Sequence, residues 1–291
     1  MRKLFSKIGD YMGLVKFAHT IFAMPFALIA FTYALKTTDA QFSWWLLLQV
    51  VLCMVFARNV AMGFNRWADR HIDAGNPRTA NREIPAKRIT PRNALAFVII
   101  NAILFIAVAS SINLLTAVLS PVALAVVMFY SYCKRFTSLA HIVLGISLGI
   151  APLGAYIAVC GTADWSTVLL ALLVTTWCGG FDIIYALQDA SYDRKNGLHS
   201  IPSRFSVATS LYISIALHII SVAALIAFAY LYLPSNYLIW IGVALFSGCI
   251  LLEHILVTPT RQRSIGIAFG TLNGLASLSL ATFIIAGLLL Q

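Results

Sequence analysis

Apolar runs of about 20 residues recur along the whole length of this chain, and a helix needs a run of this length to cross a membrane. We place nine such runs, separated by short breaks such as SSINL, GTADW and LPSN. Their approximate bounds are 17–35, 42–64, 94–112, 114–133, 138–160, 166–187, 207–231, 237–257 and 265–289. The recurrence predicts an all-α, polytopic membrane protein with about nine helices in one bundle, and a single domain over residues 1–291.

The composition excludes a soluble globular domain. The chain has 291 residues, of which 60% are hydrophobic and only 10% charged, whereas soluble domains carry roughly 25% charged residues. The first apolar run is longer than the core of a signal peptide, which spans about 7–15 residues, so we interpret it as the first membrane helix. The five cysteines lie in or beside apolar runs without metal-ligand spacing, which favours packing roles.

The basic residues predict the orientation of the chain in the membrane, because cytoplasmic loops are enriched in lysine and arginine. If the N-terminus is cytoplasmic, alternate loops face the same side: 65–93, 134–137, 188–206 and 258–264. All but two of the 20 lysines and arginines fall in these loops or in the N-terminal segment; the exceptions are Lys36 and Arg58. We therefore expect a cytoplasmic N-terminus and an external C-terminus. The net charge of +10 mostly reflects this topology, so nucleic-acid binding is not indicated, and no obligate protein partner is evident.

The acidic residues are concentrated in two segments. Six of the ten acids lie there, namely Asp69, Asp73 and Glu83, and then Asp182, Asp189 and Asp193. Each segment lies at the cytoplasmic end of a predicted helix, the second and the sixth. The patterns are N-x3-D-x3-D from Asn65 and D-x2-Y-x3-D-x3-D from Asp182. Residues four apart lie on one helix face, about 5–6 Å from each other, so the spacing predicts two acidic stripes that run from the membrane into cytoplasmic loops.

Stacked carboxylates repel each other and resist loss of solvent unless a cation lies beside them. Mg²⁺ prefers oxygen ligands and typically uses one or two carboxylates together with substrate phosphates, so two such clusters suit ions that hold a diphosphate. Basic residues that follow the two stripes would bind phosphate oxygens; they are Arg78, Arg82, Lys87, Arg88, Arg194 and Lys195. Lys134 and Arg135, at the end of the fourth predicted helix, would do the same. The alternatives are that the aspartates simply lie at solvated helix ends, and that the basic residues only set the orientation of the chain in the membrane.

The combined motifs resemble those of a known family. N-x3-D-x3-D followed by TANREIP, and D-x2-Y-x3-D-x3-D, are similar to the two aspartate-rich motifs of the UbiA-type intramembrane prenyltransferases. Y-x3-K at Tyr130 to Lys134 resembles a shorter third motif of that family. The resemblance covers essentially the whole chain. It implies Mg²⁺-dependent transfer of an isoprenoid from its diphosphate to an acceptor, usually an aromatic ring, by a protein of the inner membrane whose active site faces the cytoplasm.

The resemblance also implies roles for individual residues. The magnesium ligands and catalytic residues would be Asp69, Asp73, Asp189 and Asp193. Asn65 would help to hold the magnesium–diphosphate assembly. Asp182 would either bind metal or orient the acceptor. Diphosphate contacts would come from Lys134, Arg82 and Lys16. Arg58 lies within a membrane segment, where an arginine indicates function, and would meet an acceptor carboxylate. Aromatic side chains that flank the motifs can face an allylic cation; these are Phe64, Tyr130, Phe181 and Tyr185.

The chain departs from the family at one position, because Arg66 stands where many members have a second acid. VKFAHTIFAMPFAL and NPRTANREIP resemble enzymes of quinone synthesis. Their acceptors are 4-hydroxybenzoate or, on the futalosine route, 1,4-dihydroxy-6-naphthoate. Haem and other naphthoates remain alternative acceptors. A cation-coupled transporter is an alternative of another class, but its ionisable groups would be expected near the bilayer midplane, not at one surface.

Overall fold

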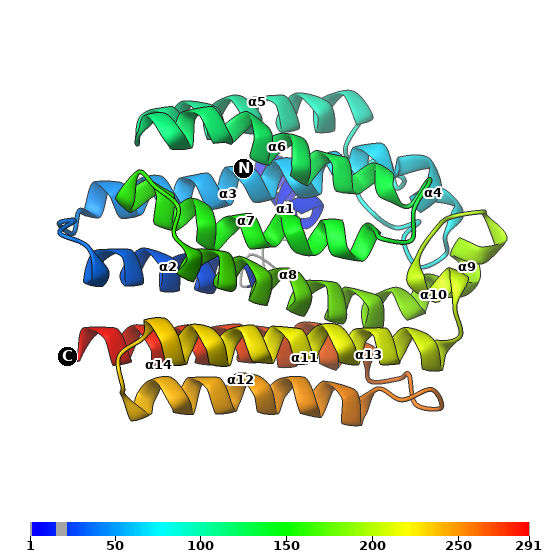
Figure 1. Cartoon of the computed structure of the whole chain (residues 1–291). Helices are drawn as coiled ribbons and strands as arrows, with labels where there is room; N and C mark the ends of the chain where they lie inside the picture. Colours follow the sequence, from blue (N-terminus) through cyan, green and yellow to red (C-terminus); the bar gives the residue numbers. More distant parts are fainter. Residues whose placement is uncertain (1, 16–21, 291) are drawn as a thin grey trace. The chain divides into compact units, whose positions relative to one another are not determined.

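The computed structural model describes residues 2–15 and 22–290 (Figure 1). The described residues form helices and connecting loops, with no strand beyond an isolated bridge between Thr258 and Arg261. They divide into two compact units. The first comprises Met1–Thr20 and Leu47–Tyr132, and the second comprises Ile21–Leu46 and Cys133–Gln291. The assignment of one domain to residues 1–291 stays a prediction.

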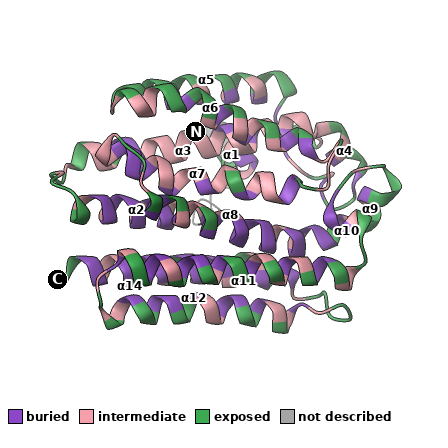
Figure 2. Ribbon diagram, viewed as in Figure 1, coloured by how far each residue is buried: buried purple, intermediate pink, exposed green. Residues whose placement is uncertain are grey.

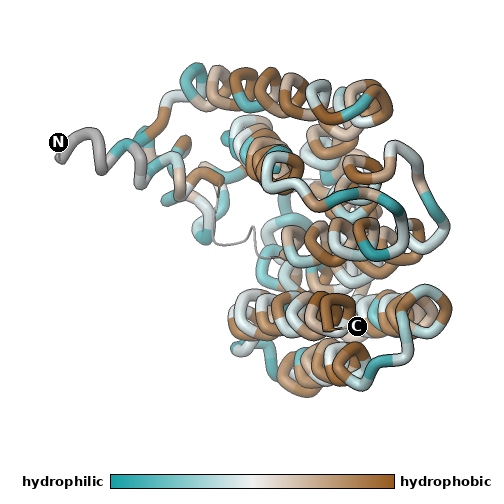
Figure 3. The backbone as a smooth tube through the Cα atoms, turned by 90° about the vertical axis from the view of Figure 1, so that its left-hand side faces the viewer, coloured by the Kyte–Doolittle hydropathy of each residue, from teal (hydrophilic) through white to brown (hydrophobic). Residues whose placement is uncertain are grey.

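Eight described helical segments are long and apolar enough to cross a membrane. They are α3 (Trp44–Ala68), α5 (Pro91–Ser110), α6 (Leu114–Cys133), α7 (Ala140–Cys160), Trp165–Lys195, α11 (Val207–Tyr232), α12 (Tyr237–Leu256) and Ile265–Leu289. Trp165–Lys195 contains α8 (Trp165–Ala186), the 3₁₀ turn η2 (Leu187–Asp189) and α9 (Ala190–Lys195). Ile265–Leu289 contains α13 (Ile265–Ile267), the π turn η3 (Ala268–Leu272) and α14 (Asn273–Leu289). Hydrophobic residues dominate these helices in Figure 3. The all-α membrane fold is thus confirmed.

The first predicted span differs from the expectation of 17–35. Residues 16–21 lie outside the described part of the chain, and α2 (Met24–Thr37) has 14 residues. A helix of that length rises about 21 Å, short of a hydrocarbon core of about 30 Å. The second predicted span also differs, because α3 continues to Ala68. Asn65 and Arg66 therefore lie within the helix and not in the loop after it.

The first unit contains α1 (Arg2–Val15), α4 (Arg70–Gly75), the span α5, α3 from Leu47 onward and α6 as far as Tyr132. Its core joins the three spans through Val60, Val98, Phe105, Leu124 and Val127. Polar side chains connect α3 to α5, since Asn59 Nδ2 donates to Asn101 Oδ1 at 2.8 Å. Lipid is as apolar as leucine, so hydrogen bonds and close packing hold such helices together.

The second unit contains α2, α7 to α9, α10 (Ile201–Arg204) and α11 to α14. Small residues let α7 and α8 approach closely: a Cβ on Gly145 would lie 2.1 Å from Thr175 O, and one on Gly149 would lie 2.8 Å from Ala171 O. Ser214 Oγ of α11 donates to Gly180 O of α8 at 2.8 Å. In an apolar 18-residue stretch of the segment that includes α8, 67% of the residues are buried, the largest share among the eight spans. Figure 2 shows this burial along α8, and the segment carries the second acidic motif.

Local sequence signals set several helix ends. The side chains of Thr90, Asp164 and Ser206 each accept a hydrogen bond from the first turn of the helix that follows. These polar side chains satisfy backbone amides that lack helical partners. Gly161 ends α7 with a φ of 69°, a conformation that glycine adopts without steric cost.

Candidate active site

The first acidic motif lies where α3 passes into α4. Asp69 occupies the N-cap position of α4, but its side chain makes no capping hydrogen bond. The backbone keeps helical spacing through the break, since the Asp69 amide donates to Asn65 O and the Asp73 amide donates to Asp69 O. Asn65 Nδ2 also donates to Asp69 Oδ2 at 3.0 Å. The predicted helical spacing of this motif is therefore confirmed.

Asp73 combines a strong basic contact with an unsatisfied oxygen. Arg82 Nη1 donates to Asp73 Oδ1 at 2.6 Å, and the carboxylate side chain is only 6% exposed. Thr79 Oγ1 donates to Asp73 O at 3.0 Å, which ties the loop that carries Arg82 to α4. Asp73 Oδ2 is buried without a hydrogen-bond partner among the described residues. Such an oxygen is costly, and a bound cation would relieve that cost.

Arg66 faces this same cluster. Its side chain is buried, and the charged groups of Asp73, Glu83 and Arg82 and the hydroxyl of Tyr130 all lie within electrostatic reach. Arg66 Nε has no hydrogen-bond partner in the described part of the chain. The arginine that replaces the family's frequent second acid therefore places a second guanidinium beside Arg82, a group suited to phosphate oxygens.

The second motif repeats the local structure of the first. The membrane helix α8 passes through η2 into α9; Asp189 is the N-cap residue of α9 without a side-chain cap, and Asp193 lies in its first turn. Each motif thus places one aspartate at a helix break and the next in a six-residue helix. The prediction of one continuous helical face from Asp182 is wrong at Leu187–Asp189, because a 3₁₀ turn winds more tightly than an α-helix.

The carboxylates of the second motif are buried beside a lysine. Asp189 and Asp193 are both buried. The Ser200 side chain, Lys134 and Asp189 all lie within electrostatic reach of the Asp193 carboxylate. The Lys134 carbonyl accepts from the His199 amide at 2.7 Å, which fixes the backbone of Lys134 to the loop after α9. Asp193 Oδ2 has no hydrogen-bond partner among the described residues.

Asp182 lies one turn before the end of α8 and contacts a histidine of α7. His141 Nδ1 is 2.7 Å from Asp182 Oδ2, and the histidine side chain is fully buried. Tyr185 stacks on Phe269 of η3 with 4.1 Å between ring centroids. Phe181 meets the same ring edge-on at 5.5 Å. The second motif therefore has an aromatic side as well as an acidic one.

The remaining predicted site residues have varied surroundings. Arg58 is half-buried in α3, two turns before Asn65. Lys16 lies outside the described residues. Two of the other basic residues contact protein groups: Arg88 pairs with Asp10 and Glu83, and Arg194 donates to the carbonyls of Pro202 and Ser203. These contacts explain Arg88 and Arg194 without any role in binding the diphosphate.

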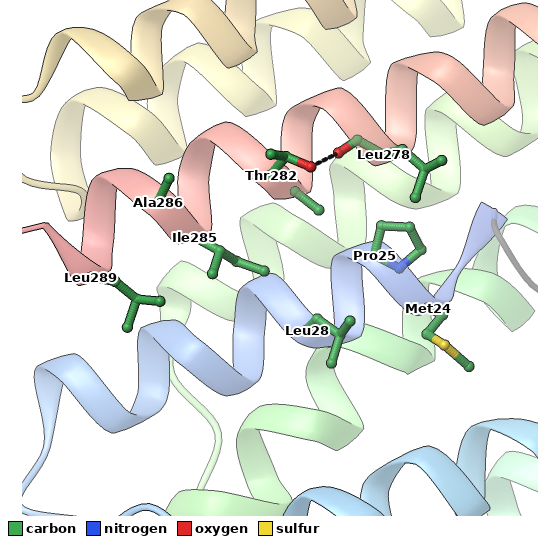
Figure 4. Close-up of a pocket in the computed structure, with 9 residues that line it drawn as sticks. Met24, Pro25, Leu28, Leu278, Thr282, Ile285, Ala286 and Leu289 are labelled. Carbon is green, nitrogen blue, oxygen red and sulfur yellow. Dashed lines mark hydrogen bonds between the residues drawn. The ribbon is translucent and has the colours of Figure 1, made fainter.

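An apolar groove lies between α2 and α14 in the second unit (Figure 4). Its volume is about 460 Å³. The lining residues are Met24, Pro25, Leu28, Leu278, Ala281, Thr282, Ile285, Ala286 and Leu289. Thr282 Oγ1 donates to Leu278 O within its own helix, so the groove offers an almost wholly apolar wall, which suits a hydrocarbon chain.

The acidic motifs fit magnesium as a ligand set completed by other groups. Within the described residues, no three histidine, cysteine or acidic side chains converge on one point. Mg²⁺ usually takes one or two carboxylates and completes its shell with water and phosphate oxygens. The unsatisfied oxygens of Asp73 and Asp193 are ligands of this kind, so the residues present fit the ion.

Sequence reasoning missed two polar contacts of the second motif. His141 is a lone histidine at the start of an apolar run, a pattern typical of a satisfied core residue. Ser200 lies in a loop with no motif of its own. Only the fold brings His141 to Asp182 and Ser200 to Asp193.

The fold and the paired motifs define a polytopic helical membrane protein with two aspartate-bearing helix breaks. Residues 23–284 match the model of the UbiA prenyltransferase family. The chain belongs to this family of membrane prenyltransferases, as the two motifs predict.

Individual relatives agree with the family. The 4-hydroxybenzoate octaprenyltransferase of Aliivibrio salmonicida is 31% identical over 228 residues, which cover 78% of this chain and 79% of the relative. The chain spans little more than half of some other curated relatives: the enzyme of the same name from Aliivibrio fischeri strain MJ11 is 32% identical over 56% of each chain. Protoheme IX farnesyltransferase of Symbiobacterium thermophilum is 40% identical over 40% of each chain.

Solved structures share the fold. The apo structure of a UbiA homologue from Aeropyrum pernix K1 has a TM-score of 0.79 and 29% identity, over 94% of this chain and 97% of that one. A UbiA homologue from Archaeoglobus fulgidus bound to GPP and Mg²⁺ has a TM-score of 0.71 and 16% identity, over 96% and 99%. The second likeness concerns the fold alone.

Proposed function

We propose that this protein transfers a polyprenyl group from polyprenyl diphosphate to an aromatic hydroxy-carboxylate, with Mg²⁺, at the cytoplasmic face of the cell inner membrane. The observation that carries the proposal is the burial and incomplete hydrogen bonding of the last aspartate of each motif. Asp73 and Asp193 are buried, each keeps a carboxylate oxygen without a hydrogen-bond partner among the described residues, and each has a cation nearby. Carboxylates and bases together are what a magnesium diphosphate requires.

The roles follow from the chemistry of each group. Each motif offers carboxylates to magnesium: Asp69 and Asp73 from the first, Asp189 and Asp193 from the second. Bound magnesium supplies positive charge that stabilises the diphosphate as it leaves. Arg82 and Lys134 donate to phosphate oxygens, and Asn65 orients Asp69 through its 3.0 Å hydrogen bond. Lys16 is proposed as a further diphosphate contact.

The reaction breaks the allylic C–O bond and forms a C–C bond to the acceptor ring, which then loses a proton. Charge that develops on the allyl group is stabilised by aromatic faces, a role we propose for Tyr130 and for the Tyr185 ring that stacks on Phe269. Asp182 lies one turn from Tyr185 and orients the acceptor. The groove between α2 and α14 takes the isoprenoid chain, because its walls are apolar.

For the acceptor we propose a phenolic carboxylate, either 4-hydroxybenzoate or 1,4-dihydroxy-6-naphthoate. The relatives named for 4-hydroxybenzoate support this class. Arg58 supplies a guanidinium within the membrane segment that would pair with the acceptor carboxylate. The relative named as a haem farnesyltransferase keeps haem as the second candidate. Family membership favours these enzymes over the cation-coupled transporter.

The experiment is product formation by the purified protein in lipid, with a polyprenyl diphosphate, Mg²⁺ and each acceptor in turn. Prenylation of one acceptor that EDTA abolishes is the expected result. Asp73→Asn and Asp189→Asn should each lower turnover by at least about 100-fold, whereas Asp39→Asn, at an exposed loop acid, should leave it unchanged. Full turnover in both motif variants, or in EDTA, would contradict the proposed metal site.

A further inference from the structure

His141 is a fully buried histidine whose two ring nitrogens both have partners in the second unit. Nδ1 lies 2.7 Å from Asp182 Oδ2 in α8. Nε2 lies 3.3 Å from the backbone nitrogen of Ile201, the first residue of α10. The ring therefore connects the start of α7 to the second acidic motif and to the loop that follows it.

The backbone contact determines which nitrogen carries the proton. A backbone N–H only donates, so Nε2 of His141 must accept and carries no hydrogen. The ring is then a neutral imidazole protonated at Nδ1, and it donates this hydrogen to the Asp182 carboxylate. A hydrogen bond to an ionised acceptor is about twice as strong as one between neutral groups. Asp182 is thus held in one orientation by a donor that cannot turn away without losing its second bond.

The same backbone turn lies beside a second aspartate of the motif. Ser200 directly precedes Ile201, caps α10 by accepting from the Ser203 amide, and lies within electrostatic reach of the Asp193 carboxylate. The loop is held to Asp193 by the bond from the Leu198 amide to Asp193 O at 2.9 Å, while Asp182 is attached to residue 201 through His141. Two aspartates 11 positions apart in the sequence therefore both connect to the loop between α9 and α10.

We propose that His141 is a positioning residue: it fixes the Asp182 carboxylate, and with it the geometry of the second motif, without touching substrate itself. The proposal rests on the proposed prenyl transfer. A carboxylate with one oxygen held by a buried donor keeps the other in a fixed direction, as in metal sites where an outer hydrogen bond orients a ligand. Asp182 keeps 15% of its side chain exposed, so it remains open to a reactant while His141 is shielded.

Two substitutions at His141 test its hydrogen bond to Asp182 separately from its hydrogen bond to the Ile201 amide. His141→Asn keeps a donor near the position of Nδ1 and should hold activity within about fivefold of the wild type. His141→Leu removes both bonds and should lower kcat/KM by roughly 10–100-fold. The loss should fall mainly on kcat/KM for the acceptor, which Asp182 orients. The control is His218→Asn, because His218 is also a buried membrane histidine with both nitrogens engaged, by Trp177 O and His254. This control should leave the ratio of the KM for the acceptor to the KM for polyprenyl diphosphate unchanged.

A double-variant test distinguishes positioning from general destabilisation. If His141 acts through Asp182, adding His141→Leu to Asp182→Asn should change kcat/KM by no more than about twofold. Equal losses in both backgrounds would overturn the proposal.

A spectroscopic measurement tests the geometry without turnover. In the ¹⁵N-histidine-labelled protein, the signal that disappears in His141→Asn should show a protonated Nδ1 and an unprotonated Nε2. The opposite tautomer would overturn the proposal even if both variants were inactive. Absence of prenyl transfer in the wild type would instead overturn the proposed function, and the tautomer would still decide the positioning geometry.

Discussion

The close contact between α7 and α8 predicts that one methyl group should disturb both stability and activity. In Gly145→Ala, the new Cβ would lie 2.1 Å from Thr175 O. A carbon–oxygen contact needs about 3.3 Å, so the two helices must separate locally by roughly 1.2 Å. A backbone carbonyl cannot rotate aside as a side chain does, so the helices themselves must move.

That separation reaches the second motif. His141 lies one turn from Gly145 on α7, and Asp182 lies two turns from Thr175 on α8, each on the same face as its neighbour. If the whole displacement reached the pair, the 2.7 Å hydrogen bond would lengthen to about 3.9 Å, beyond hydrogen-bonding distance. Overpacking of this kind costs about 1–3 kcal/mol. We therefore expect a lower midpoint of thermal unfolding and a loss of turnover of at least about tenfold.

The matched control is Gly154→Ala, on the same helix, where a new Cβ meets nothing within 4 Å. There alanine should be neutral or should stabilise by up to about 1 kcal/mol, because it is the better helix former. Unfolding can be followed by the reaction of the buried thiols of Cys133, Cys178 and Cys249 with a fluorogenic reagent, and turnover measured well below the midpoint. Equal midpoints and rates in the two variants would refute the reasoning.

Three further predictions concern the acceptor, the groove and a helix cap. Arg58→Met should raise the KM for a carboxylate acceptor by about tenfold or more and leave that for prenyl diphosphate unaltered; acceptor-saturation kinetics measure both. Ala286→Trp, within the groove, should slow long polyprenyl diphosphates more than geranyl diphosphate, whereas Leu275→Trp, exposed elsewhere on α14, should affect neither. Asp164→Ala should destabilise α8 by about 0.5–2 kcal/mol. Hydrogen bonds from Ser166 lower the pKa of Asp164, so its contribution is complete above the unfolded pKa and is lost as pH falls through the folded pKa; thermal midpoints of wild type and variant should therefore converge in acid.

The sequence by itself determined the class of fold and the location of the acidic motifs. Hydrocarbon requires about 20 apolar residues per helix, so the spans could be read from hydrophobicity alone, except where α2 is short. Spacing by four residues gave the local geometry of Asn65, Asp69 and Asp73, because the hydrogen bonds that set it are formed within the helix.

Contacts between distant segments were decided only by the tertiary structure. Nothing in the sequence pairs His141 with Asp182, which lies 41 residues further along the chain, or the Ser200 side chain with Asp193. The break at Leu187–Asp189 was equally unforeseen, because the segment contains no glycine or proline and Leu187 and Gln188 are good helix formers. Local patterns report interactions within one helix, whereas these contacts depend on how closely α7 and α8 pack, which Gly145 permits but does not specify.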